Sequence, residues 1–270
     1  MRLNRRDFVE GLGVLSLAHS AWATSEVGKT EGTGVKEDSV VELRQYTLRG
    51  GQRDTLITLF EREFLDPQNA LGAHIIGTFR DLDDPDRFVW LRGFNDMDVR
   101  QSALTRFYGG PVWLANRSAA NATMIDSDNV LLLRPATQGA GFTVSPGKAS
   151  AGGGLIGATI YYLGRADAAQ FVAVFEQMIR PHLAQLGGQP IAQLVTEEAQ
   201  NNFPRLPIRE GERTFVWFAR WHDAAAEEEF ARKLRASSGW RDSIPEAVLP
   251  ALMRKPERLR LAPTARSELR

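Results

Sequence analysis

Residues 87–96 read RFVWLRGFND, and residues 214–223 read TFVWFARWHD. Phe, Val, Trp and Asp occupy the same places in both segments, at an offset of 127 residues. Upstream, an offset of 115 residues pairs Tyr46 with Tyr161 and continues the correspondence. A register kept over half a chain is the signature of an internal repeat. The sequence therefore predicts a duplicated structural unit.

The second copy carries an insertion. The two offsets differ by 127 − 115 = 12 residues, and the extra residues fall within Thr196–Glu212, which reads TEEAQNNFPRLPIREGE. Asn, Pro and Gly are typical of loops, and strand-like segments lie on both sides of this stretch. We expect a long loop between two strands.

Each copy shows the same order of local patterns. An alternating strand precedes a helix whose apolar side chains recur every three or four residues. Two strands joined by a turn follow, and Asp96 or Asp223 is a suitable N-cap for the next helix. The first and last strands are expected at residues 41–49, 156–163, 130–135 and 258–263. This β-α-β-β-α-β order is that of the ferredoxin-like unit, whose helices cover one face of an antiparallel sheet.

Each sheet would keep one uncovered face that carries Trp, Tyr and Phe, and the sister sheet can bury it. We therefore predict an α+β fold in which two tandem ferredoxin-like (βαββαβ) repeats pack sheet to sheet as an internal pseudo-dimer; a higher oligomer stays open. The expected segments are a signal at 1–23, a leader at 24–39, a first repeat at 40–135, a linker at 136–154, a second repeat at 155–264 and a tail at 265–270.

The N-terminal segment NRRDFVEGLGVLSLAHSAWA is typical of a twin-arginine export signal. Arg5 and Arg6 precede a short apolar run, and Ala21 and Ala23 form the small-residue pattern of a cleavage site. The apolar run is too short to span a bilayer. We expect the twin-arginine translocase to export the protein to the periplasm or the extracellular space without a stable membrane anchor; the alternative is a disordered amphipathic leader.

Charge and cysteine content exclude several classes of function. Lys plus Arg and Asp plus Glu both number 33, so no excess of basic residues predicts binding to nucleic acid. The sequence contains no cysteine. Disulfides, thiolate metal sites and cysteine nucleophiles are therefore excluded.

Four segments of the first copy carry a family resemblance. They are VELRQYTLR at 41–49, DLDDPDRFVWLRGF at 81–94, FYGGPVWLANRSAANATM at 107–124 and DNVLLLRP at 128–135. Together they resemble the NIPSNAP family, a branch of the dimeric α/β barrel superfamily. The resemblance covers 40–135 well and 155–263 in outline. It implies an intrachain dimeric α/β barrel with a small-molecule cavity between the sheets, and it supplies no catalytic residues.

Strand alternation sorts the candidate site residues. Glu42, Arg44 and Tyr46 share one face, and we expect this face to look into the barrel together with Trp90 and Arg92, although the opposite assignment stays open. Guanidinium groups would stabilise an enolate or phenolate, and a tyrosine or histidine would move the proton. The catalytic candidates are Arg44, Tyr46, Arg92 and His74, and the ligand-binding candidates are Trp90, Thr78, Tyr161, Gln193 and Trp217. The alternative is a packed interface in which carboxylates such as Glu42 pair with the arginines.

Three histidines remain outside the signal, and their spacing indicates no metal site. His182 continues an apolar helical stripe and is a candidate axial ligand for haem, but a lone histidine on an apolar face is more often a hydrogen-bonded core residue. His222 lies beside Asp223, where a surface cap is the simpler interpretation. The sequence requires no cofactor, and the cofactor is left unknown.

The sequence thus predicts an exported protein that binds a small organic ligand with a carboxylate, carbonyl or phenolic group in the inter-sheet cavity. Cofactor-free oxygenase or isomerase chemistry would fit this cavity. A non-catalytic binding or protein-interaction module and a haem-binding barrel are the alternatives, so the question of enzymatic activity stays open.

Overall fold

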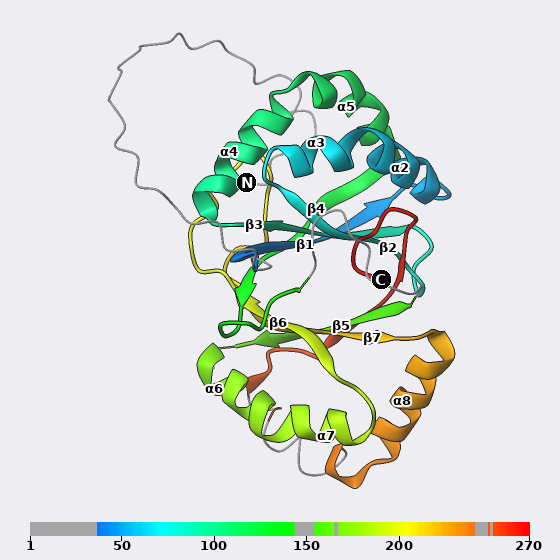
Figure 1. The fold of residues 1–270 in the computed structure, drawn as a ribbon, viewed down its shortest axis with the longest axis vertical. Helices are drawn as coiled ribbons and strands as arrows, with labels where there is room; N and C mark the ends of the chain where they lie inside the picture. Colours follow the sequence, from blue (N-terminus) through cyan, green and yellow to red (C-terminus); the bar gives the residue numbers. More distant parts are fainter. Residues whose placement is uncertain (1–36, 144–153, 165–166, 241–247, 249–250) are drawn as a thin grey trace, which may run out of the picture. The chain divides into compact units, whose positions relative to one another are not determined.

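The computed structural model describes residues 37–143, 154–164, 167–240, 248 and 251–270. In these residues eight strands close into one barrel in the order β1-β3-β2-β8-β5-β7-β6-β4. The helices lie outside the barrel in two groups, one over each repeat (Figure 1). The predicted signal, with Arg5, Arg6, Ala21 and Ala23, lies outside the described residues, as do most of the predicted leader and most of the linker.

The first repeat forms the sheet β4-β1-β3-β2, in which all neighbours are antiparallel. Its strands are β1 (Val40–Leu48), β2 (His74–Asp81), β3 (Arg87–Phe94) and β4 (Met124–Pro135). Its helices are α2 (Arg53–Leu59), the π-helical turn η1 (Phe60–Phe64), α3 (Leu65–Ala70), α4 (Met97–Tyr108) and α5 (Pro111–Thr123).

The second repeat forms the equivalent sheet β8-β5-β7-β6. Its strands are β5 (Leu155–Leu163), β6 (Pro190–Thr196), β7 (Arg213–Trp221) and β8 (Glu257–Pro263). Its helices are α6 (Ala168–Val174), the π-helical turn η2 (Phe175–Ile179), α7 (Arg180–Gln185) and α8 (Ala224–Ala236).

Register and capping confirm the predicted duplication and fold. Tyr46 lies opposite Phe88 in the first sheet, and Tyr161 lies opposite Phe215 in the second. The predicted N-caps are formed: the side chain of Asp96 accepts a hydrogen bond from the backbone of α4, as the side chain of Asp223 does from α8. A π-helical turn lies at the same place in each repeat: η1 joins α2 to α3, and η2 joins α6 to α7. Equivalent local sequences have therefore built equivalent elements.

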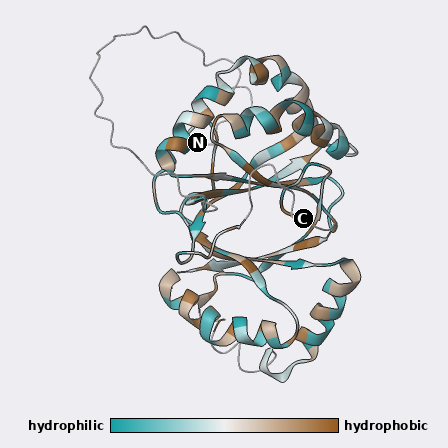
Figure 2. Cartoon of the chain, viewed as in Figure 1, coloured by the Kyte–Doolittle hydropathy of each residue, from teal (hydrophilic) through white to brown (hydrophobic). Residues whose placement is uncertain are grey.

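The two sheets join at two antiparallel seams, β2 with β8 and β4 with β6. Between the sheets lies an apolar core to which all eight strands contribute. Its members include Val41, Leu43, Ile76, Phe79, Val89, Leu91, Leu131, Leu133, Ile156, Ile160, Tyr162, Leu194, Val216, Phe218, Leu259 and Leu261. In Figure 2 hydrophobic residues lie on the strands, and hydrophobic and hydrophilic residues alternate along the helices. Each sheet is therefore buried on both faces, by helices outside and by its sister sheet inside.

One end of the barrel is closed by segments that follow the strands. Leu269 is buried in the inter-sheet core, and its backbone N–H donates to the carbonyl of Ile76 over 2.9 Å. Phe142, in the predicted linker, packs on Phe218 with ring centroids 4.9 Å apart. Among the described helices, none is both long and apolar enough to cross a membrane. The described C-terminal and linker segments therefore cover this end of the barrel.

His74 fastens the C-terminal segment at this closed end. Its Nδ1 lies 2.7 Å from Asp38 and its Nε2 lies 2.8 Å from Glu268. Burial alone would lower the pKa of His74, but hydrogen bonds and charge from the two carboxylates outweigh it and raise this pKa to about 9. The imidazole is therefore protonated at neutral pH and bridges two anions.

This bridge predicts a loss of stability at alkaline pH. A raised pKa contributes stability fully below the ordinary value of 6.5, and that contribution is lost as the pH rises through about 9. We expect the free energy of unfolding of the wild type to fall by about 1–3 kcal/mol between these limits. In His74→Gln this part of the pH dependence should disappear, as measured by urea denaturation at pH 6 and pH 9.5. Identical pH profiles for the two proteins would contradict the prediction.

Candidate functional site

The predicted orientation of the first strands was wrong. Val41 and Leu43 lie in the inter-sheet core, whereas Tyr46 and Trp90 pack under the helices of the first repeat. The centroid of the Trp90 ring lies 4.8 Å from that of Phe60 in η1. The candidate catalytic residues on β1 and β3 therefore lie between sheet and helices, not between the two sheets.

The same correction holds for the other repeat. Tyr161 and Trp217 belong to the core under α6, η2 and α8. Gln193 lies opposite Trp217 in the sheet and so shares its face, as Thr78 shares the face of Trp90. Strand alternation could not decide the matter, because both faces of each sheet are buried and both carry large apolar side chains.

The charged residues of this layer form the arginine cluster, which we define as Glu42, Arg44, Arg92 and Arg100. All four side chains are at most 1% exposed. One oxygen of Glu42, Oε2, accepts from Arg44 over 2.8 Å and from Arg92 over 2.5 Å, and Oε1 accepts from Arg100 over 2.8 Å. The contacts therefore agree with the alternative interpretation, in which Glu42 pairs with the arginines.

The cluster has further polar neighbours on α3 and on β1. Gln68 of α3 accepts a hydrogen bond from Arg92 over 2.7 Å, and Tyr46 accepts one from Arg44 over 3.1 Å. Burial would raise the pKa of Glu42, but the three guanidinium groups outweigh it and hold this pKa well below its usual range. Burial also raises the pKa of Tyr46 despite the nearby arginines. Glu42 is therefore ionised and Tyr46 is neutral.

The remaining candidates lie elsewhere. The Thr78 hydroxyl lies 2.5 Å from that of Thr264, and His74 bridges carboxylates at the closed end of the barrel. His182 Nε2 lies 2.8 Å from the hydroxyl of Ser237, so the nitrogen that would bind haem iron already has a protein partner. His222 contacts the N-cap Asp223 on the surface. Among the described residues, no three His, Asp or Glu side chains are arranged to hold a metal ion.

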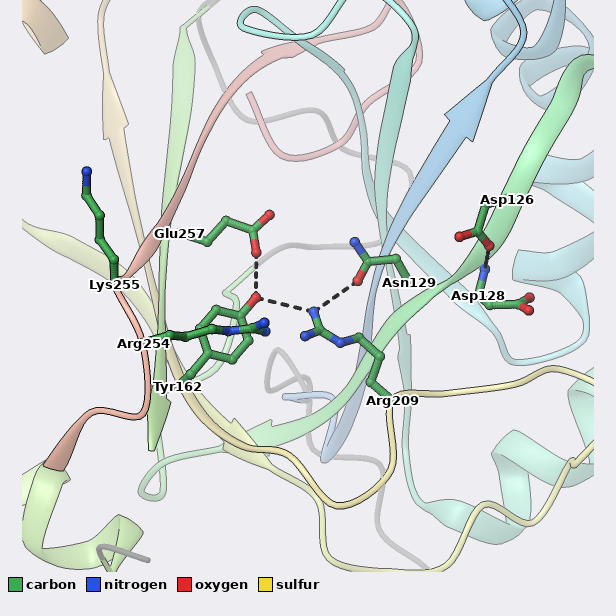
Figure 3. A pocket seen from close by; sticks show the side chains of 8 residues that line it. All are labelled: Asp126, Asp128, Asn129, Tyr162, Arg209, Arg254, Lys255 and Glu257. Atoms are coloured by element: carbon green, nitrogen blue, oxygen red, sulfur yellow. Dashed lines mark hydrogen bonds between the residues drawn. The ribbon is translucent and has the colours of Figure 1, made fainter. Parts of the chain in front are cut away.

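A cavity of about 620 Å³ lies at the open end of the barrel. We call it the barrel-mouth pocket. Side chains from both repeats line it, and those of Glu257 and Arg209 point to the hydroxyl of Tyr162 (Figure 3). The lining residues are Asp126, Asp128, Asn129, Tyr162, Arg209, Arg254, Lys255 and Glu257. In this pocket, and not in the layer between the first sheet and its helices, polar groups from both repeats surround an open space.

The Tyr162 hydroxyl donates a hydrogen bond to Glu257 and accepts one from Arg209 Nη1 over 3.3 Å (Figure 3). The same guanidinium donates to Asn129 over 3.1 Å, and Arg254 stacks on the Tyr162 ring at 3.5 Å from its centroid. Burial, and then the hydrogen bond to Glu257, raise the pKa of Tyr162. The phenol is therefore a neutral proton donor beside an acceptor carboxylate.

The insertion in the second repeat helps to build this pocket. The predicted long loop joins β6 to β7, and its Arg209 N–H donates to the Val130 carbonyl of β4 over 2.9 Å. Earlier in the same loop, Phe203 and Leu206 pack into the helix-side core of the first repeat. The loop thus crosses from one repeat to the other and carries Arg209 into the pocket.

The residues that line the barrel-mouth pocket were not predicted from the sequence. Once Val41 and Leu43 are known to face inward, alternation places Gln45 and Tyr162 on inner faces, so the signal was present but had been assigned to the wrong face. For Arg209, Arg254 and Glu257 no local signal exists, because they come from a loop and from the start of β8. Only the folded chain brings them together.

Gln45 is a polar exception inside the barrel. It is 2% exposed, and neither atom of its amide has a hydrogen-bond partner. It lies opposite Val89 of the inter-sheet core on one side and Asn129 of the barrel-mouth pocket on the other. In the second repeat the offset of 115 residues puts Ile160 in this place. An unpaired amide in an apolar core is costly, and it lies next to the pocket.

Comparison with known proteins assigns the first repeat to a protein family. The NIPSNAP family model matches residues 41–138, which span the strands and helices of the first sheet. These residues form a NIPSNAP domain. The second repeat, which completes the barrel around the NIPSNAP domain, lies outside this match. No curated protein matches the chain.

Solved structures resemble the whole two-repeat barrel. A putative monooxygenase from Lactobacillus acidophilus has a TM-score of 0.51 at 13% identity, over 84% of this chain and 94% of that chain. An anthrone oxidase-like protein has a TM-score of 0.54 at 11% identity, over 85% of this chain and 93% of that chain. At these identities the likeness concerns the fold. A NIPSNAP family protein with unknown function from Agrobacterium tumefaciens has a TM-score of 0.34 at 20% identity, over 37% of this chain and 89% of that chain.

The unpaired amide of Gln45 gives a stability prediction. Gln45→Ile copies the residue of the second repeat and removes a buried polar group without partners. We expect the free energy of unfolding to rise by about 1–2 kcal/mol, measured by urea denaturation. The control is Leu43→Gln, which adds an amide to the same inner face and should destabilise the protein. A lower stability of Gln45→Ile would show that the amide is satisfied in the folded protein.

Proposed function

We propose that the protein binds a small organic anion in the barrel-mouth pocket and transfers a proton to or from it. The cavity of about 620 Å³ suits a ligand of this size. Arg254 and Lys255 precede β8 on one side of it, and Arg209 enters from the loop opposite (Figure 3). Cations at these positions favour a carboxylate, while Asp126 and Asp128 can accept from a hydroxyl group of the ligand.

The hydrogen-bonded series Glu257, Tyr162 and Arg209 carries this proposal. A carboxylate beside a bound ligand can remove the proton next to a carbonyl group or the proton of a phenol. The Tyr162 hydroxyl and the Arg209 guanidinium would then stabilise the oxygen on which negative charge develops. Return of the proton from Glu257 to another carbon gives an isomer, so this reaction needs no co-reactant.

The names of the structural neighbours suggest an extension of the same step. One is called a putative monooxygenase and another an anthrone oxidase-like protein. An enolate or phenolate is also the electron-rich species that reacts directly with dioxygen in cofactor-free oxygenation. We propose proton abstraction as the first step in either case, with dioxygen as the co-reactant in the oxidative one.

The catalytic and ligand-binding roles predicted from the sequence stay predictions. They concern Arg44, Tyr46, Arg92 and His74 as catalytic residues, and Trp90, Thr78, Tyr161, Gln193 and Trp217 as ligand contacts. The first three lie on the helix side of the first sheet, and the barrel-mouth pocket lies on its inner side. The pocket therefore requires none of them for the proposed proton transfer.

Deuterium exchange tests the proposal without knowledge of the natural substrate. The probe is 2-oxobutyrate, a small enolisable oxo acid, in D₂O, and proton NMR follows the loss of the C3–H signal. We expect the wild type to accelerate this exchange, Glu257→Gln to slow it about 100-fold, and Tyr162→Phe to slow it with less effect on binding.

The control variant is Glu229→Gln, which removes an exposed carboxylate on α8 and should exchange at the wild-type rate. Arg254→Met should weaken binding of the probe, measured by titration calorimetry. Binding that depends on Arg254 without any exchange would favour the alternative of a non-catalytic binding module. Absence of both would remove the barrel-mouth pocket as the functional site.

We also propose export of the folded protein by the twin-arginine translocase, with residues 1–23 removed. The support is the Arg5–Arg6 pair before a short apolar run and the Ala21 and Ala23 pattern. Replacement of both arginines by lysine should leave the full-length precursor in the cytoplasm, as followed by cell fractionation and intact mass. Unchanged secretion of the double variant would contradict this route.

A further inference from the structure

The arginine cluster has an unusual balance of charge. In the described part of the chain, the hydrogen bonds of Arg44, Arg92 and Arg100 reach one carboxylate, that of Glu42. Arginine stays protonated in proteins, and Glu42 is ionised. The cluster therefore holds a net charge of about +2 in a layer where every one of its side chains is at most 1% exposed.

Neutral neighbours offset this charge only in part. The Arg92 guanidinium lies 4.9 Å from the centroid of the Trp90 ring, and that of Arg44 lies 5.4 Å from it. Such contacts stabilise each cation by less than the burial of its charge costs. Arg100 Nη2 is buried and has no hydrogen-bond partner. A donor with positive charge is thus enclosed and unpaired.

The fold itself does not need this cluster. In the second repeat Gly157, Thr159 and Ala219 take the places of Glu42, Arg44 and Arg92. A Cβ atom on Gly157 would come within 2.3 Å of the Trp221 ring, so an indole fills the corresponding layer.

The position of Arg100 is taken by Glu227, which accepts from Arg260 over 3.0 Å. One chain has thus built the same helix-on-sheet layer twice, once with buried arginines and once without. The excess charge belongs to the NIPSNAP domain and not to the architecture.

We propose that the arginine cluster is a binding site for one small monovalent anion, seated against Arg100 Nη2. A halide ion or a small carboxylate offers the required charge and accepts hydrogen bonds from guanidinium groups. The loop between β6 and β7 covers this place: Asn202 accepts from Arg100 Nη1 over 2.7 Å, and Asn201 accepts from it over 3.1 Å. This site is separate from the barrel-mouth pocket and does not depend on the function proposed for it.

The test compares anions at constant ionic strength. The melting temperature of the full-length protein is measured in sodium gluconate, whose anion is bulky, and then with gluconate replaced by chloride or by formate. We expect chloride or formate to raise the melting temperature by about 5 °C at saturating concentration. The anion with the larger effect identifies the class, halide or carboxylate. Equal melting temperatures in all three salts overturn the proposal.

A designed counter-charge makes the test specific. Asn202→Asp places a carboxylate where an amide oxygen already contacts Arg100, on a half-buried residue. We expect this variant to lose the dependence on chloride or formate. The control Ser102→Asp adds the same charge at an exposed position of α4 and should keep the dependence. An anion effect that persists in Asn202→Asp overturns the proposal, because the ion then binds elsewhere.

If Asn202→Asp does not fold, crystals of the wild type grown or soaked in sodium bromide decide the question. An anomalous difference peak within hydrogen-bonding distance of Arg100 Nη2 supports the site. Its absence at a bromide concentration that stabilises the protein in solution overturns it.

Discussion

The structure depends on the two seams at which strands of different repeats hydrogen-bond, β2 with β8 and β4 with β6. Separate sheets would each present two open edges and one wide apolar face to water. The seams remove all four edges, and the inter-sheet core fills the space inside. Because closure leaves no free sheet face, polar chemistry is confined to the ends of the barrel and to the layer under the helices.

The two repeats solve the same packing problem in different ways. The second repeat fills its helix-side layer with side chains such as Trp221 and Phe230, whose rings pack 5.5 Å apart. The NIPSNAP domain instead buries the arginine cluster, with Glu42 as the common acceptor. Duplication relaxes the demands on one copy, because the sister copy can keep the fold stable. A buried set of charges in one copy alone therefore indicates a role other than folding.

The insertion in the second repeat links the two polar regions. Within one loop, Asn202 contacts Arg100 of the cluster, Phe203 and Leu206 enter the helix-side core, and Arg209 lines the barrel-mouth pocket. The aromatic ring of Phe203 stacks on Tyr108 at 5.9 Å, which fixes the middle of the loop. The loop that contains the twelve extra residues thus borders both the arginine cluster and the barrel-mouth pocket. A displacement of this loop would alter both sites.

The sequence by itself determined the duplication, the order of elements and their ends, because these follow from local rules: Asp96 and Asp223 cap helices, and Gly72 and Gly187, with φ of 90° and 91°, end them. Tertiary structure alone decided which face of each strand looks inward. Apolar side chains occupy both faces, so the alternation along a strand does not distinguish the inner face from the helix-side face. Tertiary structure also decided the barrel-mouth pocket, because Tyr162, Arg209 and Glu257 are distant in the chain and meet only when the barrel closes.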